Sequence, residues 1–125
     1  MGRLRSETLD RLENFADRVM DVVEELDRQG RSKRVVEQLA GSGTSSGANA
    51  FEADEAMTRK DFAKCLGIVT KELNETRFWL RLVGRRSWIQ AKRLDPLVRE
   101  TEDLKSMFGS MIVRTRRRDA LPPKK

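Results

Sequence analysis

Apolar residues recur along the chain with the period of an α-helix. In the amino-terminal segment they fall three or four residues apart, at Leu9, Leu12, Ala16, Val19, Val23 and Leu26. This spacing places one apolar stripe on the surface of a helix. Ser6 is available as its N-cap, and Gly30 is suited to stop it. We therefore predict a first helix over residues 6–29.

A later segment carries two apolar stripes with the same period. The first consists of Phe62, Leu66, Val69, Leu73, Thr76, Leu80 and Val83. The second stripe, which runs alongside, consists of Cys65, Ile68, Glu72, Glu75, Trp79 and Leu82. Thr58 followed by Asp61 is a variant of the capping box, and Gly84 marks an end, so we predict a helix over residues 58–84. A helix with two apolar stripes usually packs against two neighbours.

The carboxy-terminal part predicts a helix followed by a tail. Asp95 can cap its free amides, and Pro96 at the first helical position loses no hydrogen bond. One face then continues through Leu97, Thr101, Leu104, Phe108 and Met111, which predicts a helix over residues 95–113. The closing sequence "RTRRRDALPPKK", residues 114–125, has paired prolines and a run of charge. It is expected to be a basic, disordered tail.

The stretch "LAGSGTSSGANAFE", residues 39–52, has two interpretations. Its glycines favour a linker, because each costs about 1 kcal/mol relative to alanine inside a helix. Yet a helical period continues through Val36, Ala40, Gly43, Gly47 and Ala50. In a helix over residues 32–54, Gly43 and Gly47 would lie one turn apart on a face that another backbone can approach closely. Propensity and period alone leave both interpretations open.

Composition excludes several kinds of chemistry. The 125 residues suffice for one domain with one core. Histidine is absent, which excludes histidine-based metal sites and any nucleophile paired with histidine. A di-iron site of the ferritin type could use the carboxylates of Glu52, Glu72 and Glu75. Such sites also need Glu-x-x-His motifs, which a chain without histidine cannot supply. We therefore expect no metal, no cofactor, no catalytic residue and no enzymatic activity.

The single cysteine and the hydropathy of the chain indicate where in the cell the protein is expected to lie. Cys65 is the one cysteine, so no disulfide can form within the chain. No apolar run approaches the roughly 20 residues that span a bilayer, and the amino terminus "MGRLRSETLD" lacks the apolar segment of a signal peptide. We expect a cytoplasmic protein with no membrane contact.

Two motifs lie within residues 38–83. The first is a small-residue helix of the form "QL.RSGTS.GAN..EA", and the second reads "DF..KL.I...E..E...WL". The matching residues are Gln38, Leu39, Ser42, Gly43, Thr44, Ser45, Gly47, Ala48, Asn49, Glu52, Asp61, Phe62, Leu66, Ile68, Glu72, Glu75, Trp79 and Leu80. This pattern resembles the bacterial 23S ribosomal RNA intervening-sequence proteins. Gly41 and Ser46 depart from it, where the family commonly has arginine and an aliphatic residue.

The resemblance implies an all-α fold, an antiparallel up-and-down four-helix bundle that assembles into a ring, a homopentamer. It favours the helix over residues 32–54, with Gly43, Gly47 and Asn49 at a close helix contact. The second stripe, Cys65, Ile68, Glu72, Glu75, Trp79 and Leu82, would form the contact between subunits. Because Glu72 and Glu75 interrupt this apolar row, we expect them to pair with an arginine across a helix contact or a subunit contact, such as Arg77 or Arg81 of a neighbour.

Up-and-down topology places the first and third turns at the same end of the bundle. These turns carry eight basic residues, here called the basic rim: Arg28, Arg31, Lys33, Arg34, Arg85, Arg86, Lys92 and Arg93. The rim is interpreted either as a phosphate-binding surface or as cations that complement helix dipoles. Trp88 either stacks on a base or packs onto the end of the bundle. The tail from Arg114 to Arg118 is either a phosphate-binding arm or a solvated terminus.

Two functions remain open. The segments "RFWLRLV" and "GSMIVRTRRR" are also similar to the accessory protein of diversity-generating retroelements, which binds a reverse transcriptase and nucleic acid. The resemblance favours an oligomeric, non-catalytic accessory or scaffold protein that binds RNA or DNA through the rim and docks a partner enzyme. The alternative is a purely structural homo-oligomeric ring that binds other proteins and no nucleic acid.

Overall fold

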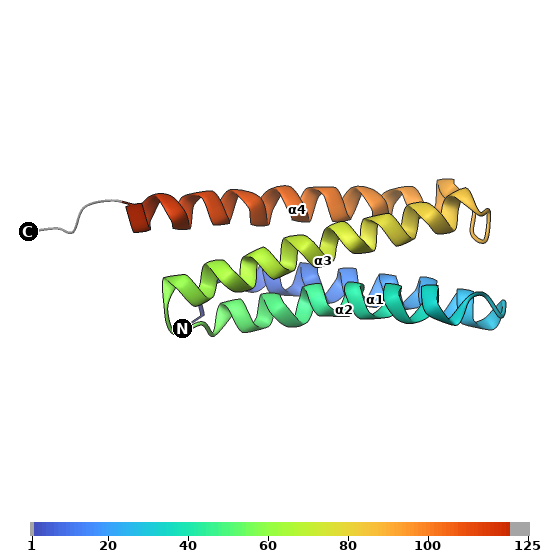
Figure 1. Cartoon of the computed structure of the whole chain (residues 1–125), viewed down its shortest axis with the longest axis horizontal. Coiled ribbons are helices and arrows are strands. Elements are labelled where there is room, and N and C mark those ends of the chain that lie inside the picture. Colours follow the sequence, from blue (N-terminus) through green and yellow to red (C-terminus); the bar gives the residue numbers. More distant parts are fainter. Residues whose placement is uncertain (1, 121–125) are drawn as a thin grey trace, which may run out of the picture.

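The computed structural model describes residues 2–120, and over that range the chain forms four helices and no strand (Figure 1). They are α1 (Ser6–Arg28), α2 (Lys33–Asp54), α3 (Arg59–Arg85) and α4 (Ala91–Ala120). Successive helices run in opposite directions. The α1–α2 and α3–α4 turns therefore lie at one end, and the α2–α3 turn and the chain termini lie toward the other (Figure 1). The all-α four-helix prediction is confirmed.

The first three helices begin and end within one residue of the predicted bounds. Ser32 caps α2 by accepting a hydrogen bond from the Val35 amide at 3.4 Å, and Thr58 caps α3 by accepting from the Asp61 amide at 3.0 Å. The N-cap of α1 is Arg5, without a side-chain cap, and Ser6 instead donates to Glu7. Gly30 follows the end of α1 with a φ of +71°, a conformation that favours glycine, as predicted from the sequence.

Helix α4 is longer than predicted at both ends. It begins at Ala91, so Pro96 lies inside the helix rather than at its first position. At the other end it continues to Ala120, which corrects the prediction of a disordered tail for residues 114–120. The reason is burial, because Thr115 is 7% exposed and its hydroxyl donates to the Met111 carbonyl at 2.8 Å. Residues 121–125 lie outside the described part of the chain.

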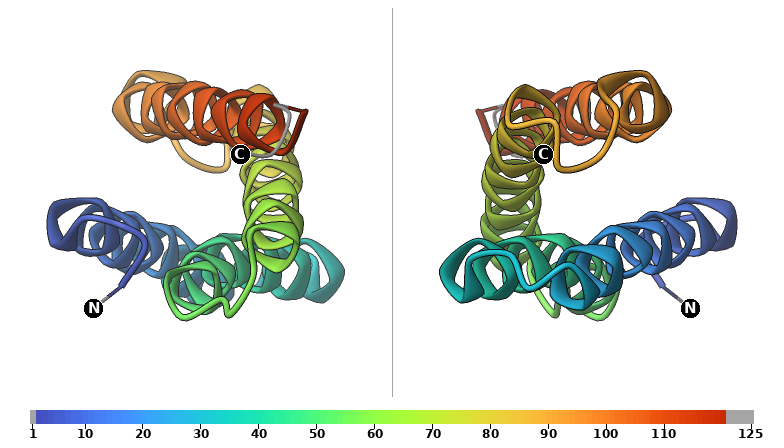
Figure 2. Two further views of the ribbon diagram at one scale, coloured as in Figure 1. Left: turned by 90° about the vertical axis from the view of Figure 1, so that its left-hand side faces the viewer. Right: turned by 90° about the vertical axis from the view of Figure 1, so that its right-hand side faces the viewer.

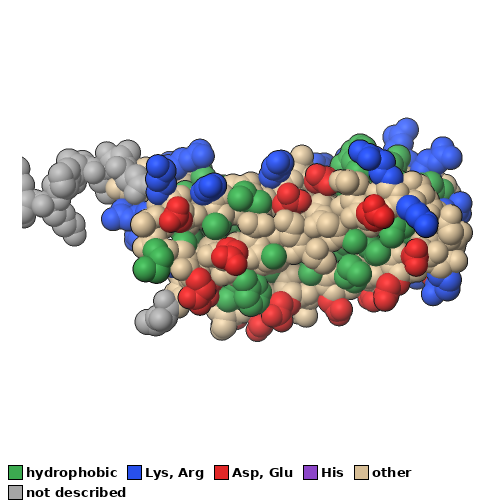
Figure 3. Space-filling view, turned by 60° about the horizontal axis from the view of Figure 1, so that its bottom comes forward, with side chains coloured by type: hydrophobic (Ala, Val, Ile, Leu, Met, Phe, Trp, Pro, Cys, Tyr) green, Lys and Arg blue, Asp and Glu red, His purple; other side chains and the backbone are tan. Residues whose placement is uncertain are grey.

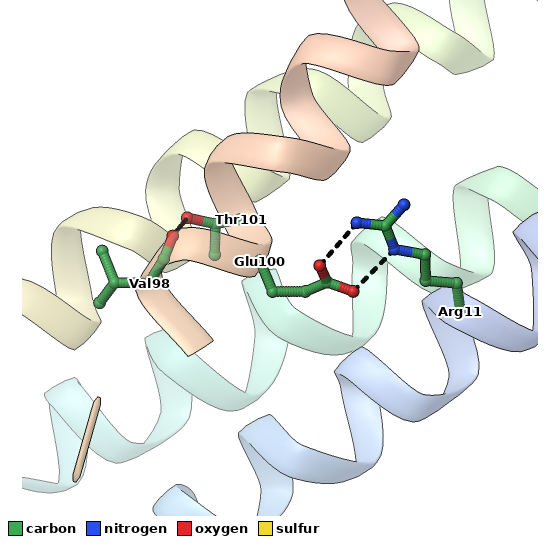
Figure 4. Close-up of polar contacts among 4 residues, drawn as sticks. All are labelled: Arg11, Val98, Glu100 and Thr101. Carbon is green, nitrogen blue, oxygen red and sulfur yellow. Dashed lines mark hydrogen bonds and ion pairs between the residues drawn. The ribbon is translucent and has the colours of Figure 1, made fainter. Parts of the chain in front are cut away.

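The packing is centred on α3, which lies between α2 and α4, while α1 packs on α2 (Figure 2). The predicted apolar stripes supply much of the core, including Leu12, Val19, Leu66, Leu73, Leu80, Leu104 and Phe108. Phe15 of α1 and Leu39 of α2 are fully buried core residues that lie outside the predicted stripes. Helices α1 and α4 pack least closely of the neighbouring pairs. The Arg11 guanidinium joins them by donating to both carboxylate oxygens of Glu100, at 2.8 and 2.9 Å (Figure 4).

The glycine-rich stretch is a continuous part of α2. A Cβ atom added at Gly43 would lie 2.5 Å from Cγ1 of Val19, so the absence of a side chain lets α1 approach. At Gly47 the added Cβ would be 3.7 Å from the Leu12 carbonyl oxygen, an ordinary contact. On the α3 side, the Thr76 hydroxyl donates to the buried Ser42 hydroxyl at 2.9 Å. Small residues thus bring α2 close to both of its neighbours.

Candidate nucleic-acid interface

The structure ties together the two turns that carry the basic rim. The side-chain amide of Gln29, in the α1–α2 turn, donates to the Trp88 carbonyl in the α3–α4 turn at 3.0 Å. The guanidinium carbon of Arg31 also lies 5.3 Å from the centre of the Trp88 ring. Residues almost sixty positions apart in sequence therefore form one surface at the end of the bundle.

The α3–α4 turn has a fixed backbone conformation. The amides of Arg86, Ser87 and Trp88 donate to carbonyls in the last turn of α3 at 2.9 to 3.2 Å. Ser87 adopts a left-handed conformation with a φ of +57°, which reverses the chain, and Ile89 is buried behind it. This geometry leaves Arg85 and Arg86 exposed to solvent at the end of α3.

The eight rim residues divide into two groups. Arg28 forms an ion pair with Glu25, and Arg31 donates to the Gln29 side chain at 2.9 Å while covering Trp88. The other six make no side-chain hydrogen bond or ion pair with any residue between 2 and 120: Lys33, Arg34, Arg85, Arg86, Lys92 and Arg93. All six are exposed. They can bind an anion without breaking an existing pair.

Trp88 belongs to the packing of the bundle end. Its side chain is partly buried against the core, and the Arg31 guanidinium lies over its ring. Of the two interpretations of this residue, the structure supports packing.

The second stripe on α3 is half-buried along its length. Cys65 and Trp79 pack partly against the core, whereas Ile68 and Leu82 are only half-covered and stand outside that cluster. The Trp79 indole N–H donates to a Glu75 carboxylate oxygen at 3.2 Å, a bond within one helix that sequence reasoning missed. This face therefore retains apolar surface that a single chain does not cover.

The acidic members of this stripe have no ion pair among the described residues. Burial raises the pKa of the Glu72 carboxyl, and the nearby charge of Glu75 raises it further. Arg77 lies instead beside Glu102 of α4, with its Nε 3.9 Å from a carboxylate oxygen. Pairing of Glu72 or Glu75 with an arginine of another subunit stays a prediction.

The hydrogen bonds of Asn49, which was expected at a close helix contact, lie within α2. Its side-chain amide donates to the Ser45 carbonyl at 2.9 Å and to the Ser45 hydroxyl at 3.1 Å, both within α2. The spacing of four residues brings these groups together on one helix face. The close contact between helices depends on Gly43 and on the Ser42–Thr76 bond instead.

Two grooves were not anticipated. One, of about 460 Å³, lies on α3 and is lined by Asn74, Arg77, Phe78, Arg81, Leu82 and Arg85. The four-residue spacing of its arginines was the signal available in the sequence. The other, of about 560 Å³, lies near the chain termini, and its lining includes Arg3, Arg5, Arg114 and Arg118. Figure 3 shows that basic side chains gather mainly toward the two ends of the molecule, with acidic ones spread between them.

Within residues 2–120, no group of three or more Cys, Asp or Glu side chains is arranged to hold a metal ion. Among the helices of the described chain, none is long and apolar enough to cross a membrane.

Comparison with known proteins gives a family match and a structural match. A family model described as "23S rRNA-intervening sequence protein" matches residues 6–110. The chain is also similar to a crystal structure of a protein of unknown function from the S23 ribosomal protein family of Bacteroides thetaiotaomicron VPI-5482. The TM-score is 0.80 at 31% identity, over 84% of this chain and 97% of the other. No curated protein matches significantly.

Proposed function

This chain belongs to the 23S rRNA-intervening sequence protein family, and from that membership and the basic rim we propose that it is a non-catalytic accessory protein that binds RNA or DNA. The observation that carries the proposal is the group of six exposed, unpaired cations at one end of the bundle. Phosphate binding at such a surface gains free energy from the release of counterions.

The position of these cations argues against a purely structural role. Cations stabilise the carboxyl end of a helix and are unfavourable at its amino end. Arg85 and Arg86 lie at the carboxyl end of α3, so their charges are explained by stabilisation of the helix dipole. Lys33 and Arg34 lie in the first turn of α2, and Lys92 and Arg93 lie in the first turn of α4. Neither turn has an acidic residue, so stabilisation of the helix dipole does not explain these four cations. An anionic ligand at this end would compensate both these cations and the free amides of the two helix starts.

The proposal includes self-association into a ring, for which the resemblance suggests a homopentamer. Two features support it. Ile68 and Leu82 leave apolar surface on the α3 face. Charge is also unevenly divided, because α1 has eight acidic and three basic residues whereas α3 has seven basic and three acidic ones. The acidic α1 of one copy against the amino-terminal half of α3 of the next, which carries Lys60, Lys64 and Lys71, would be electrostatically complementary. A ring would repeat the rim and increase avidity for a long nucleic acid.

We propose a cytoplasmic location, where the protein would meet nucleic acid and a partner enzyme that it docks. The second candidate, a structural ring without nucleic-acid binding, is favoured by the same half-exposed α3 face. The two candidates differ in whether the unpaired rim cations bind phosphates.

The test compares two variants with equal loss of charge. The rim variant changes Arg85, Arg86, Lys92 and Arg93 to glutamine. The termini variant changes Arg114, Arg116, Arg117 and Arg118 to glutamine, so each lowers the formal net charge of +6 by four. Binding of a labelled structured RNA and a DNA duplex is measured by fluorescence anisotropy near physiological salt.

We expect the rim variant to lose at least about tenfold in affinity and the termini variant to change less than about threefold. Equal losses in both variants would show a non-specific charge effect and contradict the rim as the site. If the unmodified protein binds neither probe, the structural ring becomes the better account.

A further inference from the structure

The groove on α3 has a feature that phosphate binding alone does not use, an exposed aromatic ring beside arginines. Phe78 is 57% exposed, and the groove lining has arginines at positions 77, 81 and 85 and no acidic residue. We infer that this groove binds single-stranded nucleic acid, with an unpaired base stacked on Phe78 and the adjoining phosphates on Arg81 and Arg85. The inference rests on the proposed function and specifies the form of nucleic acid that is bound.

The Phe78 ring is held in a defined position. It meets the Trp79 ring edge to face, with centroids 4.9 Å apart and planes inclined by 70°. Trp79 is in turn anchored by its hydrogen bond to Glu75 at 3.2 Å. A ring that is supported from one side and still largely exposed can stack on a base with little loss of conformational freedom.

The arginines form a ladder along one side of that ring. Residues four apart lie on one helix face, with successive positions separated by about 6 Å along the axis. Arg81 and Arg85 make no side-chain ion pair or hydrogen bond within the described residues. Arg85 also belongs to the basic rim, so a strand in the groove continues onto the rim without a break in positive charge.

The inner end of the ladder has an unsatisfied donor. Nε of Arg77 is buried without a hydrogen-bond partner, and the nearest carboxylate, of Glu102, is 3.9 Å away. Lys105 lies close by, because its ammonium donates to the Asn74 side-chain oxygen at 3.0 Å. Two acidic residues lie near the ladder, Glu102 beside Arg77 and Asp95, which lines a smaller groove with Arg81 and Arg85. Neither lines the groove that holds Phe78, so that groove retains a positive balance suited to phosphate oxygens.

An intact duplex does not fit these features as well as a single strand. Base pairs in a duplex have their faces covered by stacking on one another, so a protein ring cannot stack on them without disrupting the helix. Stacking on aromatic side chains is the usual way in which proteins hold unpaired bases. The exposed face of Phe78 therefore favours unpaired RNA or DNA over a duplex.

The experiment uses the full chain and two labelled probes, a twelve-nucleotide oligouridylate and an RNA duplex of equal length, in anisotropy titrations at one salt concentration. Phe78→Leu removes the aromatic face and keeps apolar bulk. Phe51→Leu is the matched control, because Phe51 is an exposed phenylalanine of α2, at 42% exposure. Light scattering on each variant reports whether the oligomeric mass has changed.

We expect Phe78→Leu to weaken binding of the oligouridylate by about tenfold, to leave duplex binding within about twofold, and Phe51→Leu to change neither. If Phe78→Leu leaves both affinities unchanged, or weakens both equally, the inference is overturned while the proposal that the rim binds phosphates still stands. Binding of the duplex but not of the oligouridylate would have the same meaning. Smaller particles for Phe78→Leu would place Phe78 in a subunit contact and also overturn it. If neither probe binds the unmodified protein, the proposed function itself fails.

Discussion

The contact between α1 and α2 at Gly43 allows a quantitative test of the fold. We consider Gly43→Ala beside Gly41→Ala, two changes in the same helix that differ in their surroundings. A Cβ atom at Gly43 would lie 2.5 Å from Cγ1 and 3.0 Å from Cβ of Val19, whereas at Gly41 nothing lies within 4 Å. Val19 is fully buried, and its branched side chain has little freedom to turn away.

The expected free energies follow from these distances. Each change gains about 1 kcal/mol from the higher helix propensity of alanine. At Gly43 this gain is opposed by overpacking, which costs about 1 to 3 kcal/mol. Gly41→Ala should therefore stabilise the protein by about 1 kcal/mol. The difference between the two variants isolates the packing cost, since the propensity gain cancels.

The assay is urea unfolding followed by circular dichroism, at matched protein concentration because self-association would add to apparent stability. Gly47→Ala serves as an internal control, because its Cβ would make only an ordinary contact at 3.7 Å, and it should behave like Gly41→Ala. Equal stabilisation by Gly41→Ala and Gly43→Ala, with equal urea dependence, would refute the close approach of α1 to α2.

Three other residues or pairs give sharp expectations. Burial raises the pKa of Glu72 above its ordinary value of 4.5, so the charged form is disfavoured in the folded state and stability falls as the pH rises through that raised pKa. Glu72→Gln should therefore raise the unfolding temperature at pH 7 but not near pH 3, and a lower value at pH 7 would indicate a cationic partner. Ile68→Lys should give smaller species in light scattering, and an unchanged assembly would remove Ile68 from the subunit contact. A double-mutant cycle of Arg11→Ala and Glu100→Ala should show a coupling of about 0.5 to 1 kcal/mol, and additive effects would show that this ion pair contributes nothing.

The sequence predicted most of the fold because the core stripes keep a strict helical period. The buried positions of α3 from Leu66 to Val83 are those of its first predicted stripe. Helix α2 was harder, since local propensity opposed the period and only the family resemblance decided between them. The ends of α4 were missed because tertiary contacts determine them. Burial of Thr115 keeps the helix intact beyond residue 113, and no local signal reports that burial.

The candidate site was predictable only in part. Topology alone placed the eight rim residues at one end, but which of them are free depends on side-chain contacts such as that of Arg31 with Trp88. The hydrogen-bond partner of Asn49, Ser45 of the same helix, was not predicted, because spacing identifies a helix face and not a hydrogen-bond partner. The exposure of Phe78 could not be anticipated either, since it depends on the sides of α3 that α2 and α4 cover.

The salt dependence of RNA binding tests the central claim most directly. Affinity for a duplex probe is measured at several salt concentrations for the unmodified protein, the rim variant and the termini variant. Each lost phosphate contact lowers the slope of log affinity against log salt by about 0.9, so the rim variant should lose about three to four units of slope. The termini variant should lose less than about one unit. Equal slopes for the rim variant and the unmodified protein would contradict phosphate binding by the rim.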